Sequence, residues 1–77
     1  MTSKIANIMD RNLALDRYLQ SLPHEERIAK SRDIREMLGI SRFVLSDWRR
    51  GRTMLHPVFF DKIKEIVGVD LDLYIEK

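Results

Sequence analysis

The stretch DIREMLGISRFVLSDWRRGR, residues 33–52, contains the pattern that decides the fold of this chain. Its first half predicts a helix that ends at Gly39, because glycine adopts the left-handed conformation common at helix ends without a steric penalty. Ser41 can then cap the free amides of a second helix, which we expect to span residues 41–50 and to end near Gly51. The stretch therefore predicts a helix, a glycine turn and a second helix.

The helix expected over residues 41–50 has one apolar and one polar face. At about 100° per residue, Val44, Leu45 and Trp48 point to the same side, and we expect them to pack in the core. The opposite face is left for solvent or for a ligand, and it consists of Arg42, Phe43, Ser46, Asp47, Arg49 and Arg50.

The segments before this stretch predict one long helix and a connector. Apolar side chains recur at steps of three and four between Ser3 and Ser21, which is typical of an amphipathic helix capped by Ser3 or, if it begins late, by Asp10. Pro23 ends that helix. Residues 24–30 are mostly polar and are interpreted as a connector with room for one helical turn.

The next helix is expected to begin at Ser31 as its cap and to end at Leu38. Asp33 lies in its first turn, where a negative charge suits the helix dipole.

Beyond the stretch, Pro57 predicts the start of a further helix that carries Val58, Phe59, Ile63, Ile66 and Val67 and ends at Gly68. The tail, residues 69–77, alternates like a strand, yet Leu71, Tyr74 and Ile75 also form one stripe of a short helix capped by Asp70. We favour the helix. The fold class expected for the single domain, residues 1–77, is all-α: a compact bundle of about five short helices.

Positive charge is concentrated in the middle of the chain. Residues 27–52 carry eight basic and three acidic side chains, although the net charge of the whole chain is only +2. A basic centre between mildly acidic flanks is expected when one surface meets a polyanion. A solvated, charged helix face is the alternative explanation.

The polar face of the helix at residues 41–50 suggests contacts to base edges in DNA. Arg42 and Ser46 lie one turn apart near the helix start, and a guanidinium group can bond the O6 and N7 atoms of guanine. Phe43 could contact thymine methyl groups, or fill a gap against the preceding helix or a partner chain. Asp47 could accept from cytosine N4 or hold Arg42 or Arg50 in place. The candidate base-reading residues are Ser41, Arg42, Phe43, Ser46 and Asp47.

A second set of residues suits the DNA backbone, since contacts to phosphate supply affinity and register without sequence information. The start of the helix at Ser31 would add free amides and the positive end of the helix dipole. The candidate phosphate-binding residues are Lys30, Ser31, Arg32, Arg49, Arg50 and Arg52.

Composition excludes several other classes of protein. The chain has no cysteine, so a disulfide or a thiolate metal site is ruled out. It has no apolar run of the roughly 20 residues that a membrane span needs and no signal-peptide pattern, so we expect an unprocessed cytoplasmic protein without membrane contact. His24 and His56 are isolated. We therefore expect no enzyme activity, no catalytic or metal site, no cofactor and no small-molecule ligand.

The stretch resembles the lambda-repressor-like helix-turn-helix family, which includes phage Cro and repressor proteins and bacterial XRE-type regulators. The resemblance covers residues 30–73, with the helix-turn-helix at about residues 31–51. Arg35 departs from it, because this position is usually a small alanine, so its side chain must reach out to solvent or change the angle between the two helices. The connector from Pro23 to Lys30 also looks longer than usual. The residues at the family's spacing are Ile34, Leu38, Gly39, Ile40, Ser41, Leu45, Ser46, Trp48 and Gly51.

The resemblance implies a sequence-specific regulator of transcription, of the phage or bacterial repressor type, that reads the major groove of double-stranded DNA with the helix at residues 41–50. It also implies a homodimer, for which the candidate surfaces are Leu73 to Ile75 or the group Ile5, Ile8 and Met9. The alternative is a protein-interaction module, or an antitoxin-like partner, that uses the same helical fold.

Overall fold

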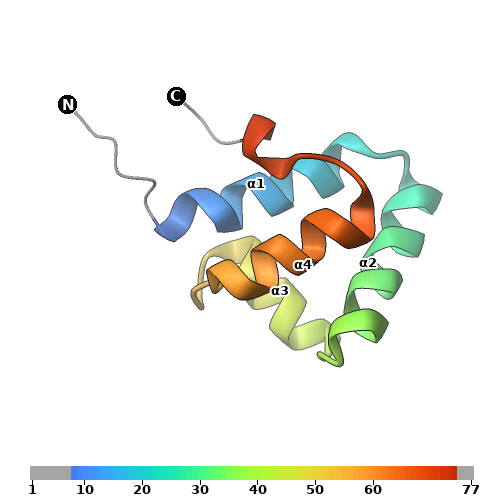
Figure 1. Ribbon diagram of the computed structural model, residues 1–77. Helices are drawn as coiled ribbons and strands as arrows, with labels where there is room; N and C mark the ends of the chain where they lie inside the picture. Colours follow the sequence, from blue (N-terminus) through green and yellow to red (C-terminus); the bar gives the residue numbers. More distant parts are fainter. Residues whose placement is uncertain (1–7, 75–77) are drawn as a thin grey trace.

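The computed structural model describes residues 8–74, with side chains from residue 10 onward, and all regular elements in that range are helical. The prediction of an all-α fold is therefore confirmed, although the described residues form four α-helices and one short 3-10 helix rather than about five α-helices. In Figure 1, α4 runs beside α2 and the 3-10 helix lies against α1. The elements are α1 (Ile8–Ser21), α2 (His24–Leu38), α3 (Arg42–Arg50), α4 (Pro57–Val67) and η1 (Leu71–Tyr74).

Helix α1 ends at Ser21, as predicted. The expected start at Ser3, and the side chains of Ile5, Ile8 and Met9, lie outside the described residues.

Helix α2 begins earlier than expected. The predicted connector at residues 24–30 is helical, and the predicted cap Ser31 lies inside the helix, so both of these predictions were wrong. Pro23 occupies the N-cap position without a side-chain hydrogen bond, and Glu25 and Glu26 place negative charge in the first turn, where the helix dipole favours it. The segment is polar because α2 exposes much of its surface, and its Glu, Arg, Lys and Ala residues all favour helix.

The junction between α2 and α3 follows the sequence prediction. Gly39 has a φ of 67°, in the left-handed region, and the backbone amides of Gly39 and Ile40 both donate to the carbonyl oxygen of Arg35. The Ser41 hydroxyl accepts from the amide of Val44 at 3.2 Å, which caps α3. A turn of three residues, 39–41, therefore sets the direction in which α3 leaves α2.

Helix α3 ends in the arrangement that its sequence indicates. Gly51 has a φ of 73°, its amide donates to Trp48, and the amide of Arg52 donates to Asp47. These two bonds together are the Schellman motif, in which a left-handed residue lets the last carbonyl groups find donors.

Within the C-terminal tail, Leu71–Tyr74 form a short helix rather than a strand, and Ile75 lies outside the described residues. Asp70 caps η1 by accepting from the amide of Asp72 at 3.0 Å, as expected for the helical alternative. The ring of Tyr74 packs edge-on against that of Tyr18, with centroids 5.8 Å apart, and Arg17 donates to the Tyr74 carbonyl oxygen. Burial, followed by the nearby Tyr74 and Glu26, raises the pKa of Tyr18, so this phenol stays neutral at physiological pH.

The core is one cluster of buried side chains to which the four α-helices, Leu55 and η1 all contribute. Leu45 and Trp48 are buried as predicted, but Val44 is 37% exposed, because it lies at the edge of the apolar face. Among the apolar residues in the first turn of α4, Val58 and Phe59 are exposed and Phe60 is buried. The buried hydrophobic side chains are Ala14, Leu15, Tyr18, Leu19, Ile34, Leu45, Trp48, Leu55, Phe60, Ile63, Val67 and Leu71.

We expect Trp48→Ala to lower the free energy of unfolding by about 3–5 kcal/mol, because it leaves a large cavity in a small core. Urea denaturation followed by circular dichroism measures this loss. The matched control is Met37→Ala, since Met37 is 72% exposed on α2, and it should change stability by no more than about 0.5 kcal/mol. Equal losses in the two variants would contradict the assignment of Trp48 to the core.

Candidate functional site

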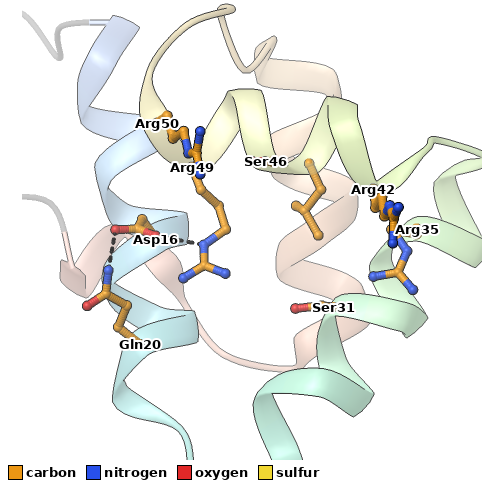
Figure 2. A pocket seen from close by; sticks show the side chains of 9 residues that line it. Asp16, Gln20, Ser31, Arg35, Arg42, Ser46, Arg49 and Arg50 are labelled. Atoms are coloured by element: carbon orange, nitrogen blue, oxygen red, sulfur yellow. Dashed lines mark hydrogen bonds and ion pairs between the residues drawn. The ribbon is translucent and has the colours of Figure 1, made fainter. Parts of the chain in front are cut away.

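A groove of about 460 Å³ lies between α1, α2 and α3. Figure 2 shows α1 on one side with Asp16 and Gln20, α2 on the other with Ser31 and Arg35, and α3 across the two. Four arginines and one carboxylate line it, so its charge is positive. The lining residues are Asp16, Gln20, Ser31, Arg35, Arg42, Leu45, Ser46, Arg49 and Arg50.

The predicted polar face of α3 is present, but its members differ in exposure. Arg42, Phe43 and Arg50 are exposed, whereas Ser46, Asp47 and Arg49 are half-buried. Phe43 is 68% exposed, and the Arg42 guanidinium lies 5.2 Å from the centre of its ring. An exposed cation–π contact of this kind contributes only about 0.5–1 kcal/mol. The Phe43 ring is therefore available to a ligand rather than packed against α2.

Arg49 is held in place by α1. Its Nε donates to Asp16 Oδ1 at 2.7 Å, and each of the two side chains is about three-quarters buried. Gln20 donates to the other carboxylate oxygen, Oδ2, at 2.8 Å (Figure 2). A charge-assisted bond of this length is among the stronger hydrogen bonds in proteins. Arg49, which the sequence placed in the phosphate-binding set, thus enters the groove already paired with a carboxylate.

Asn12 fixes the C-terminal end of α3, next to Arg49. Its side chain is almost fully buried, and its Nδ2 donates to the carbonyl oxygens of Trp48 at 2.7 Å and Thr53 at 2.8 Å. Its Oδ1 accepts from the amide of Leu55 at 3.3 Å. One amide group therefore ties α1 both to the last turn of α3 and to the loop that leads into α4.

The sequence prediction missed Asn12, Asp16 and Gln20 as members of this assembly. The three residues are spaced by four, so they form one polar row along α1. Asn12 occupies a position in the apolar periodicity of the helix, and a polar residue at such a position was the available signal. Its hydrogen-bond partners lie in another segment of the chain, so the sequence around Asn12 could not identify them.

The other predicted residues are dispersed around the groove. Ser31 lines it, but from the interior of α2, so the free amides expected there belong instead to the turn after Pro23. Lys30 and Arg32 lie on α2 and Arg52 just after α3, and none of the three lines the groove.

Two of the predicted base-reading residues differ from the rest of the set: Ser41 has a structural role, and Asp47 has no ion-pair partner among the described residues. Ser41 is exposed at the turn, where its hydroxyl caps α3. Asp47 forms no ion pair with any described residue, so the expectation that it holds Arg42 or Arg50 is not met. The carboxylate that orients an arginine of α3 is Asp16.

His56 caps α4 by accepting from the amide of Val58 through Nδ1 at 3.2 Å. Among the described residues, no cluster of three or more histidine, aspartate or glutamate side chains is placed to hold a metal ion. Within the same part of the chain, no helix has the length and apolar character needed to span a membrane.

Comparison with known proteins does not assign the chain. No protein-family model, no curated protein sequence and no solved structure matches it. The resemblance to lambda-repressor-like proteins therefore stays a prediction.

We expect Asn12→Ala to lower the free energy of unfolding by at least about 2 kcal/mol, because the buried backbone amide of Leu55 and the carbonyl oxygens of Trp48 and Thr53 each lose a hydrogen bond. Urea denaturation measures the loss, and faster hydrogen exchange at the Leu55 amide would locate it. Leu13→Ala, at an exposed neighbouring position on α1, is the control and should cost less than about 1 kcal/mol. An unchanged Leu55 exchange rate would show that the Asn12 bonds do not hold the loop.

Proposed function

We propose that the protein is a sequence-specific DNA-binding regulator of transcription, of the helix-turn-helix type, that inserts the exposed face of α3 into the major groove of double-stranded DNA. The observation that carries the proposal is the division of α3 into two faces. Leu45 and Trp48 anchor one face in the core, while Arg42, Phe43 and Arg50 are exposed on the other. An anchored helix with an exposed, basic face is the element that such proteins place against base edges.

The turn before α3 supports the same assignment. Gly39 and Ser41 give α3 a short, defined entry, so that Arg42 lies in its first turn. The first turn of a recognition helix is the part whose side chains reach base edges most directly. Arg42 is thus proposed to read a base.

The charge of the site supports a polyanionic partner. Within the described residues, Arg42 and Arg50 have no ion-pair partner, and Asp16 is taken up by Arg49. Exposed guanidinium groups without carboxylate partners are available for phosphate, which supplies most of the affinity in protein–DNA binding. Arg50, at the far end of α3, is proposed to position the protein on the backbone.

We propose that the protein binds DNA as a homodimer, because α3 is short. A single α3 of nine residues reaches only a few base pairs, and two copies on half-sites about one helical turn apart, roughly 34–36 Å, would read a longer palindrome. Leu73 is exposed at the end of the described chain, so η1 is a candidate contact surface.

A second candidate function, a protein-interaction module, is favoured by one observation. Met37 and Phe43 are large apolar side chains that are mostly exposed, near the C-terminal end of α2 and at the start of α3. Exposed apolar side chains of this kind are common where a protein partner docks. Binding to duplex DNA discriminates between the two functions.

Selection of bound sequences from random duplexes should yield a palindromic consensus. Binding to that consensus should weaken steeply as salt rises, because the protein displaces counterions from the DNA. The control is a duplex of the same length and shuffled sequence, to which affinity should be lower by about 10³-fold or more. Absence of binding to any duplex at low salt would overturn the proposed function in favour of the protein-interaction module.

Arg42→Ala and Arg50→Ala should have different effects on binding. Loss of Arg42 should weaken binding to the consensus by about 1–3 kcal/mol and relax the preference at one base pair. Loss of Arg50 should weaken binding to all duplexes alike and lower the slope of log K against log salt by about 1. Fluorescence anisotropy over a salt series measures both. The same behaviour in both variants would contradict the assignment of one residue to bases and the other to phosphate.

A further inference from the structure

Arg35 is the residue of the groove that the proposed function leaves unexplained. It lies on α2, outside the face of α3 that is proposed to read bases, and it is half-buried. The sequence led us to expect that its side chain would reach out to solvent or change the angle between the two helices. Instead it lines the groove, together with Arg42 from α3 and Ser31 from its own helix (Figure 2).

The backbone of Arg35 is needed for the turn, but its side chain is not. Its carbonyl oxygen accepts the amides of Gly39 and Ile40, which close the end of α2. Its guanidinium forms no ion pair and no hydrogen bond with another described residue. The side chain therefore contributes charge to the groove without a visible role in holding the fold together.

The surroundings of Arg35 have an unbalanced charge. Among the described residues, Asp16 is the only acid that lines the groove. It lies on the side of α1, and both of its oxygens already accept hydrogen bonds, one from Arg49 and one from Gln20. In the view of Figure 2, Arg35 and Arg42 lie on the opposite side of the groove. Like charges gathered in a partly buried groove repel each other, and an anion between them would remove that cost.

We propose that the groove between α1, α2 and α3 is a phosphate-binding site, in which the Arg35 guanidinium holds the phosphate group and the hydroxyls of Ser31 and Ser46 donate to it, while Arg42 adds positive charge to the same wall and keeps its proposed contact to a base. Both serines line the groove and are half-buried. Guanidinium groups bind phosphate through two parallel hydrogen bonds, and hydroxyls supply further donors. The volume of about 460 Å³ is many times the roughly 30 Å³ that one water molecule occupies in the liquid.

The Asp16–Arg49 pair has a positioning role in this site. It holds one arginine of α3 against α1 and neutralises the carboxylate that would otherwise repel the anion. The positive charge of Arg35 and Arg42 on the opposite wall is then free to attract the phosphate, because Asp16 is already paired.

The phosphate can come from the DNA backbone or from a free phosphorylated molecule, and only the first source rests on the proposed function. In the first case Arg35 supplies a backbone contact from α2, in addition to the contact of Arg50 from α3. In the second case the groove binds the phosphate group of a free molecule, independently of DNA.

The test uses the intact protein in two experiments. In the first, inorganic phosphate is titrated into ¹⁵N-labelled protein, at constant ionic strength kept with chloride, and amide shifts are followed by NMR. Saturable shifts at Ser31, Arg35 and Ser46 are expected in the wild type. They should be lost in Arg35→Ala and kept in Lys62→Ala, which removes an exposed charge of α4 that does not line the groove.

In the second experiment, binding to duplex DNA is measured over a salt series. If the phosphate is that of the backbone, Arg35→Ala should lower the slope of log K against log salt by about 0.9, while Lys62→Ala leaves it unchanged. Saturable phosphate shifts with an unchanged slope, or with no DNA binding at all, would assign the groove to a free phosphorylated molecule. Circular dichroism of each variant establishes that it is folded, and Arg35→Gln, which also removes the charge but keeps a long side chain, is the substitute if the alanine variant is not.

The inference is overturned if phosphate produces no saturable shifts in the wild type and the slope of Arg35→Ala equals that of the wild type. DNA binding that persists in that case would leave the proposed function standing. Absence of DNA binding together with saturable phosphate shifts would remove the proposed function and leave the groove as an anion site. The failures of the two proposals are therefore distinguishable.

Discussion

The arrangement of this molecule depends on the buried amide of Asn12. A polar group in a core costs free energy unless all its partners are present, and here two carbonyl groups and one amide satisfy it. These partners lie at the end of α3 and in the following loop, so the position of α3 is fixed from α1. The Asp16–Arg49 pair lies one turn further along α1 and acts on the same helix. The exposed face of α3 is thereby held rigidly without contributing to the core itself.

Local structure around α3 could be predicted because its causes are local. The left-handed glycines Gly39 and Gly51 and the cap Ser41 determine where the helix begins and ends from neighbouring atoms alone. The burial of Leu45 and Trp48 followed from helical periodicity, and only Val44, at the edge of the apolar face, departed from it. The start of α2 was predicted wrongly because a polar segment was taken for a connector, although an exposed helix is also polar and its residues favour helix.

The candidate site was predicted only in part, because it is formed by residues far apart in the sequence. Arg42, Ser46, Arg49 and Arg50 were expected from the polar face of α3, and all four line the groove. Asp16 could not be assigned, because its partner Arg49 is 33 residues away and an acid on a helix surface usually has no fixed partner. Arg35 was recognised as unusual for its position, yet only the fold shows that α1 and α3 complete a groove around it.

The bonds of Asn12 span 36, 41 and 43 residues of the chain, and this has a consequence for how the protein folds. A helix of nine residues such as α3 is too short to be stable alone in water. It becomes ordered when α1, which lies far before it in the sequence, packs against α3 and the loop at residues 51–55. Contacts between residues this far apart form late in folding, because the chain loses the entropy of closing the loop before it gains the contact. The segment of residues 31–51 is therefore not an autonomous unit, and a synthetic peptide of that segment alone would sample many conformations.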